Sequence, residues 1–121
     1  MGYRSDVAVV IYGDHRDSQK YALIKTLMNT AFKEVYEEWD KSFEWHDDKH
    51  VLKFEVADVK WYDSYPDVIR FTTMLEEIGD IEGLNYEFIR VGEEVEDVVT
   101  QEGGACVEYI LTVTREIQVD L

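Results

Sequence analysis

The hydrophobic pattern of the chain starts with residues 6–12 (DVAVVIY), in which five of seven side chains are aliphatic. A run of this length is too short for a buried helix and is typical of a strand that is covered on both faces. Such a strand belongs in the middle of a sheet. We therefore expect the rest of the chain to pair with this strand or to pack over it.

Two stretches carry the periodicity of amphipathic helices. Between residues 18 and 40, apolar side chains recur at steps of three and four, which predicts one helix capped by Asp17 or Ser18. A second helix is expected to start near Pro66, with Ser64 as its cap, and to stop at Gly79. The two apolar stripes are Tyr21, Ile24, Leu27, Met28, Ala31, Val35 and Trp39 in the first helix, and Val68, Phe71, Thr72, Leu75 and Ile78 in the second.

Alternation of apolar and polar side chains predicts four further strands. Residues 42–45 and 50–56 flank a polar turn and should form a hairpin, and residues 84–89 and 105–119 alternate in the same way. Residues 93–104 are acidic, end in two glycines and are expected to form a loop. In the last strand, the expected inward side chains are Val107, Tyr109, Leu111 and Val113, and the outward ones are Glu108, Ile110, Thr112, Thr114 and Glu116.

The resulting order, β-α-β-β-α-β-β, is that of an α+β protein. Its first six elements match the split βαβ arrangement, so we expect a ferredoxin-like antiparallel sheet with two helices on one face and an extra C-terminal strand. The other face should be open or partly used, with Tyr3, Tyr12 and Trp61 as its candidate aromatic side chains. The length of 121 residues, without a linker or repeat, predicts a single domain over residues 1–121.

Charge is the unusual feature of the composition. The chain has 27 acidic and 12 basic residues, a formal charge of −15. Residues 61–121 hold 15 of the acidic residues and 3 of the basic ones. Such a field repels nucleic acid and anionic membranes and attracts basic proteins. A net charge of magnitude about 2–8 is enough for solubility. The excess is expected either for a surface that binds a basic partner or for a solvated acidic face, and the sequence leaves both interpretations open.

Several function classes lack their sequence signals. The single cysteine, Cys106, forms no internal disulfide, and residues 1–6 lack the apolar core of a signal peptide. No apolar run approaches the ~20 residues that cross a bilayer. A cytoplasmic location is therefore expected. No P-loop, dinucleotide fingerprint or G-x-S-x-G motif occurs, so we expect neither a cofactor nor an enzymatic activity.

The acidic half contains the main candidate site. DNA presents one charge per ~1.7 Å of its axis, and carboxylates spread along helix ends and loops can occupy the basic groove of a protein that binds it. We expect the chain to bind a basic, nucleic-acid-handling protein and not nucleic acid itself. The predicted partner-binding residues are Glu76, Glu77, Asp80, Glu82, Glu93, Glu94, Glu96 and Asp97.

Two smaller clusters carry other hypotheses. Trp61, Tyr62 and Tyr65 are candidate aromatic anchors for a partner, or they cover the end of the core. His46 and His50 flank the predicted hairpin turn and are weak candidates for a metal site. Two alternatives stay open. One is a ferredoxin-like homodimer that binds a small ligand or metal near His46, His50 and Trp61, with or without a catalytic activity. The other is a structural or assembly accessory protein that uses its open sheet face.

Three segments resemble a known group of proteins. Residues 1–7 (MGYRSDV), 60–66 (KWYDSYP) and 88–93 (FIRVGE) are similar to recurring segments of small uncharacterised proteins from tailed-phage genomes. The resemblance implies a phage origin and a place in the host cytoplasm, and it carries no activity or site residues. Small acidic phage proteins often bind and block a host factor, so the resemblance makes the expected partner a host protein, such as a nuclease of a defence complex.

Overall fold

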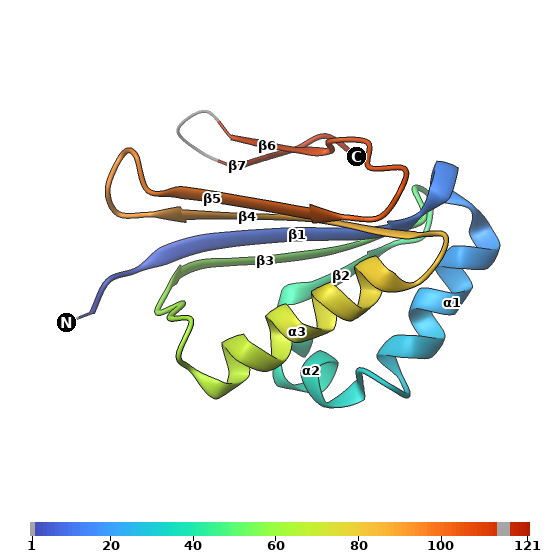
Figure 1. Cartoon of the computed structure of the whole chain (residues 1–121), viewed down its shortest axis with the longest axis horizontal. Helices are drawn as coiled ribbons and strands as arrows, with labels where there is room; N and C mark the ends of the chain where they lie inside the picture. The colour runs from blue at the N-terminus through green and yellow to red at the C-terminus, as the bar shows by residue number, and fades with distance from the viewer. Residues whose placement is uncertain (1, 114–116) are drawn as a thin grey trace.

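The computed structural model describes residues 2–113 and 117–121. It is an α+β arrangement of three layers (Figure 1). A five-stranded antiparallel sheet forms the middle layer, the helices cover one of its faces, and a two-stranded hairpin lies on the other.

The predicted central strand is confirmed. β1 (Ser5–Gly13) pairs with β3 (Val51–Val59) on one side and with β4 (Leu84–Gly92) on the other, antiparallel in both cases. β2 (Phe43–His46) and β5 (Val98–Gly103) form the two edges, which gives the order β2-β3-β1-β4-β5. Side chains of β1 are buried on both faces, and those of Val9 and Val10 are 0% exposed. The run of aliphatic residues therefore marks the strand that both layers cover.

Residues 18–40 do not form the single helix that the sequence predicted. The chain forms α1 (Ser18–Met28) and α2 (Lys33–Glu38), followed by the 3₁₀ turn η2 (Asp40–Ser42). Between α1 and α2, the Phe32 N–H donates to Leu27 O at 2.8 Å and the chain changes direction. This bend keeps Phe32 and Val35 in the core, where a straight helix would leave the sheet. The cap is confirmed, because the Asp17 carboxylate accepts from the Lys20 N–H.

α3 (Pro66–Asp80) starts at the predicted proline but has neither the predicted cap nor the predicted stop. Its N-cap is Tyr65, which makes no side-chain capping bond, so Ser64 does not cap it. Gly79 is the second-to-last residue of α3, which ends at Asp80, one residue beyond the predicted stop. A Cβ on Gly79 would lie 3.4 Å from Gly103 Cα and 3.0 Å from Tyr86 Cε1. The glycine permits this close approach of helix and strand.

Aromatic rings dominate the core between the sheet and the helices. The ring centroids of Phe54 and Phe71 lie 4.5 Å apart, and that of Trp61 lies 5.4 Å from Phe71. Trp61 is 5% exposed and belongs to this helix-side core, so its predicted place on the outer sheet face is wrong. The segment between β3 and α3 turns the indole inward, where its large apolar surface is removed from water.

The predicted strand over residues 105–119 is also wrong. The predicted loop instead supplies β5, which adds to β4, and the chain then crosses the sheet and forms the hairpin β6 (Leu111–Val113) and β7 (Ile117–Val119). Tyr109 has a φ of 57°, which breaks extended alternation. As a result Ile110 and Leu111 are both buried, and Tyr109 is 65% exposed. The predicted outward positions Thr114 and Glu116 lie outside the described residues.

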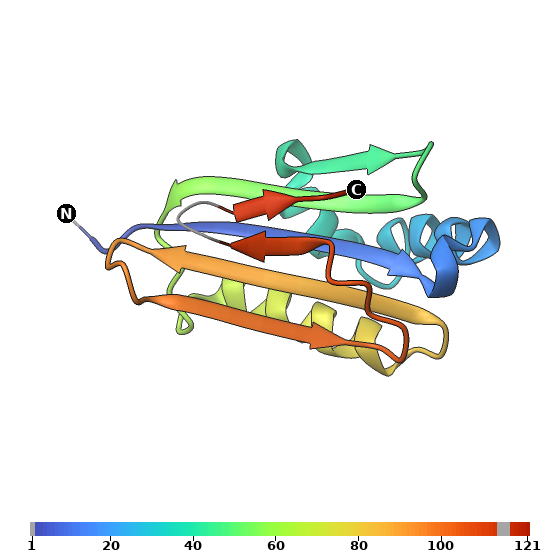
Figure 2. The ribbon, with the colours of Figure 1, turned by 90° about the horizontal axis from the view of Figure 1, so that it is seen from above.

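The hairpin covers most of the second sheet face. Seen from above, it lies over β3, β1 and β4, and it leaves β5 uncovered (Figure 2). Ala8, Val10 and Tyr12 of β1 are buried beneath it, so Tyr12 is not the exposed aromatic that the sequence predicted. Within residues 2–113 and 117–121, no helix has the length and apolar character that a membrane span requires.

Candidate functional site

The predicted acidic residues form two groups at opposite ends of β4. Glu76, Glu77, Asp80 and Glu82 lie at the end of α3, and we call them the helix-end group. Glu93, Glu94, Glu96 and Asp97 form the turn between β4 and β5, and we call them the turn group (Figure 1). Because β4 has nine residues, the two groups lie about 26 Å apart. This separation is about three Debye lengths at physiological salt, so each group attracts cations independently.

The helix-end group gathers carboxylates around one phenol. Burial, together with the charges of Glu76, Asp80 and Glu102, raises the pKa of Tyr86. These four residues and three glycines line a surface hollow of about 480 Å³. Glu102 also belongs to this site. The sequence did not indicate it, because the segment that forms β5 was expected to be a loop. The lining contains no basic residue, so the hollow suits a cationic side chain from a partner.

Among the residues that the structure describes, the carboxylates of the helix-end group belong to no ion pair. The last turn of α3 has no basic residue, and the helix dipole adds partial negative charge there. Near α2 the situation is different, because Arg70 of α3 lies 3.5 Å from Glu34 and 2.5 Å from Glu38. Hydrogen bonding to Arg70 holds the pKa of Glu38 below its usual range. The end of α3 is therefore the stronger attractor for a basic partner.

The turn group divides into one structural and three exposed residues. Asp97 Oδ1 accepts from Arg90 Nη2 at 2.8 Å, and Asp97 Oδ2 accepts from Tyr3 Oη at 2.6 Å. These two contacts, with that of Arg90 first, hold the pKa of Asp97 below its usual range. Asp97 thus fixes the turn, and its charge is already paired. The three glutamates of the turn group are exposed and belong to no ion pair of the described residues.

The candidate aromatic anchors have different environments. Trp61 is part of the core, as described above. The Tyr62 hydroxyl accepts from the Tyr3 N–H at 2.7 Å, and the Tyr62 and Tyr65 rings meet edge to face at 5.0 Å. Tyr65 is 36% exposed. Of the three, Tyr65 is the one whose ring is most available to a partner.

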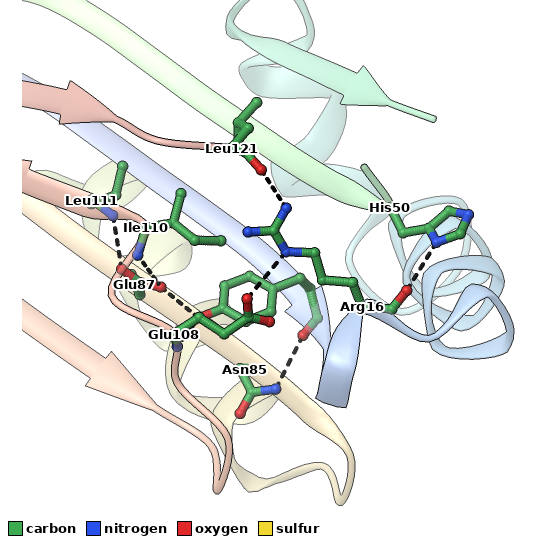
Figure 3. Close-up of polar contacts among 9 residues, drawn as sticks. Arg16, His50, Asn85, Glu87, Glu108, Ile110, Leu111 and Leu121 are labelled. Carbon is green, nitrogen blue, oxygen red and sulfur yellow. Dashed lines mark hydrogen bonds and ion pairs between the residues drawn. The ribbon is translucent and has the colours of Figure 1, made fainter. Parts of the chain in front are cut away.

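The two histidines are held by different partners. His46 Nε2 lies 3.0 Å from Glu44 Oε1, whereas His50 Nδ1 lies 2.9 Å from Arg16 O (Figure 3). In the part of the chain that the structure describes, no three His, Cys, Asp or Glu side chains are grouped to hold a metal ion. Trp61 lies in the helix-side core, whereas His46 ends β2 and His50 directly precedes β3.

A buried carboxylate that the sequence analysis did not select lies between the sheet and the hairpin. Glu87 is 4% exposed, and its Oε2 accepts from Tyr12 Oη at 2.5 Å and from the Ile110 N–H at 3.0 Å. Its Oε1 accepts from the Leu111 N–H at 2.9 Å (Figure 3). The Tyr12 hydroxyl in turn accepts from the Glu108 N–H, and burial raises the pKa of Tyr12. Glu87 thus fastens the segment before β6 to the sheet.

Further polar contacts extend this attachment. Arg16 forms an ion pair with Glu108 at 3.3 Å, and its Nη1 donates to Leu121 O at 2.5 Å (Figure 3). Asn85 Oδ1 accepts from the Cys106 N–H at 2.9 Å. Burial, with the nearby Asp14 charge, raises the pKa of the Cys106 thiol, which favours an inert protonated side chain. The whole network therefore has the chemistry of a structural attachment.

A groove runs between β5 and the hairpin. It has a volume of about 310 Å³, and Tyr109 stands at its rim with its hydroxyl 3.4 Å from Glu102 Oε1. The lining residues are Glu87, Phe88, Ile89, Thr100, Gln101, Glu102, Tyr109 and Leu111. The hairpin stops short of β5 (Figure 2), and the groove lies in the space between them.

Comparison of the chain with models of protein families, with curated proteins and with solved structures found no match.

Proposed function

We propose that this chain is a non-enzymatic binding protein of phage type that inhibits or redirects a basic, nucleic-acid-handling host protein in the host cytoplasm. The observation that carries the proposal is the placement of exposed carboxylates, without ion-pair partners among the described residues, at both ends of the β4–β5 hairpin. Seven exposed acidic residues of the two groups, together with Glu102, present this charge. The alternative, a solvated acidic face, does not explain why these carboxylates are concentrated in two places.

The arrangement favours a partner with two basic patches. A nucleic acid strand carries its charges evenly, one per ~3.4 Å, and a continuous mimic would do the same. Here the carboxylates cluster about 26 Å apart, with Thr100 and Gln101 of β5 between them. A groove with basic residues at both ends and a neutral centre would therefore fit this surface best.

We also propose that the fold is a ferredoxin-like one with additions. The order β2-β3-β1-β4, with helices between β1 and β2 and between β3 and β4, supports this interpretation. β5 and the β6–β7 hairpin would then be the additions. The uncovered part of the second face is small, which weakens the alternative of an assembly protein that docks through an open sheet.

The test is a capture experiment from bacterial lysate at two salt concentrations. At about 0.1 M salt the Debye length is ~10 Å, and at about 1 M it is ~3 Å. We expect a nucleic-acid-handling protein to be retained at the lower concentration, to be lost at the higher one, and to be released by added duplex DNA. Retention that is indifferent to salt and DNA would contradict the proposal.

A further inference from the structure

Of the features that protect most strand edges, the outer edge of β5 has one, the charge of Glu102. Natural edge strands are short, charged, bulged or interrupted by proline, because an open edge pairs readily with another strand. β5 has the sequence VVTQEG, without lysine or proline, and pairs with β4 in unbroken register over six positions. The other edge, β2, has four residues and carries Glu44, whose carboxylate lies 3.5 Å from Lys53 Nζ.

The backbone of β5 presents free hydrogen-bonding groups at this edge. At the turn, the Gly92 N–H donates to Asp97 O at 2.8 Å, and the Val98 N–H donates to Glu96 O at 3.0 Å. Along an antiparallel ladder, residue pairs that exchange hydrogen bonds alternate with pairs whose N–H and C=O groups point away from the partner strand. The N–H and C=O groups of Thr100 and Glu102 therefore point away from β4. In residues 2–113 and 117–121, no strand other than β4 pairs with β5.

The surroundings of this edge select the chemistry of a strand that would pair with it. The hairpin does not cover β5, so the edge is accessible from above (Figure 2). The turn group lies at the start of β5, and the helix-end group with Glu102 lies at its end. Six residues of strand span about 20 Å, so an added segment with cations at both ends would reach both groups.

We propose that β5 binds an extended segment of the partner by strand addition, and that this segment carries lysine or arginine on both sides of a short uncharged stretch. The inference rests on the proposed function, since it describes how the basic partner is held. Main-chain hydrogen bonds to Thr100 and Glu102 would give affinity, and the flanking cations would give selectivity. A second copy of this chain is disfavoured, because antiparallel pairing would place its turn group beside Glu102.

The test uses a synthetic peptide of about ten residues, with alternating valine and threonine in the centre and two lysines at each end. Two further versions of the peptide carry backbone N-methyl groups, one version on every odd central residue and the other on every even central residue. We expect the parent peptide to bind and one methylated version to lose about tenfold or more in affinity, because its N–H groups facing β5 are removed. The other methylated version should bind much more tightly than the first.

Two protein variants give an independent readout. Thr100→Pro removes an outward N–H at a position where an edge strand tolerates proline, and Thr100→Val keeps that N–H. We expect about tenfold weaker peptide binding for the proline variant alone. Equal binding of both methylated peptides would overturn strand addition and leave the acidic function standing. Absence of binding by the parent peptide would also overturn it, while the salt-dependent capture from lysate judges the proposed function separately.

Discussion

Glu87→Gln tests whether one buried carboxylate attaches the C-terminal hairpin to the sheet. In the native protein its two oxygens accept three hydrogen bonds, from Tyr12 and from the N–H groups of Ile110 and Leu111. A glutamine has the same shape but only one acceptor oxygen. Whichever way the amide turns, its NH₂ group faces at least one backbone N–H, and that donor is left buried without an acceptor.

The expected loss follows from these contacts. A hydrogen bond to a charged group is worth about 1.5–3 kcal/mol, and a buried unsatisfied donor costs about 1–3 kcal/mol. Removal of the charge also removes the cost of burying it, which offsets part of the loss. We therefore expect the free energy of unfolding to fall by about 2 kcal/mol. For a chain of this length, this corresponds to a fall in Tm of roughly 6–10 °C.

The assay combines thermal unfolding with amide hydrogen exchange. Exchange at Ile110 and Leu111 should accelerate by about 30-fold, the equivalent of ~2 kcal/mol, and exchange at Val9 in the centre of the sheet should accelerate by no more than that. Glu102→Gln makes the same chemical change at an exposed position of the neighbouring strand, and it should alter stability by less than about 0.5 kcal/mol. An unchanged Tm and unchanged exchange at Leu111 in the Glu87 variant would refute the reasoning.

Two further predictions concern other polar contacts. Asp97→Asn should lower the Tm because Arg90 pairs with Asp97 and holds the pKa of its carboxyl group low, whereas Glu96→Gln in the same turn should leave the Tm unchanged. The stability that the Asp97 carboxylate contributes is fully present above about pH 4 and should disappear as the pH falls through its lowered pKa. Burial raises the pKa of Tyr12 and of Tyr21, so the unfolded chain ionises first and stability should fall as the pH rises above about 10. Tyrosine absorbance and circular dichroism followed together should show this ionisation coinciding with unfolding, and ionisation of every tyrosine near pH 10 in the folded protein would contradict it.

The strands with strong apolar patterns could be predicted from the sequence, whereas the edge strand and the final crossing could not. Residues 98–103 contain only two apolar side chains, because an edge strand that the hairpin leaves uncovered has little to bury. The positive φ of Tyr109 follows from packing of the segment over the sheet and has no signal in the local sequence. The sequence does not show the break between α1 and α2, because the apolar spacing of Met28, Ala31 and Val35 continues through the bend without interruption.

The candidate site shows the same division. Acidic residues could be listed from the sequence, but their separation into two groups depends on the length of β4 and on the direction in which the chain turns. Pairing removed Asp97 from the exposed set, and the unexpected strand added Glu102 to it. Glu87 had one sequence signal, a carboxylate within the otherwise apolar run Tyr86, Phe88 and Ile89. Its burial became visible only when the hairpin was placed over that face.

The most direct test of the central claim compares two charge-reversed variants for binding to the captured partner. One carries Glu76→Lys and Glu94→Lys, with one change in each acidic group, and the other carries Asp40→Lys and Asp48→Lys, two exposed acids near the opposite sheet edge. Both variants have the same net charge. The account predicts that the first pair weakens binding by about tenfold or more at moderate salt, and that the second has little effect. Equal effects of the two pairs would show that only net charge matters and would contradict the proposed site.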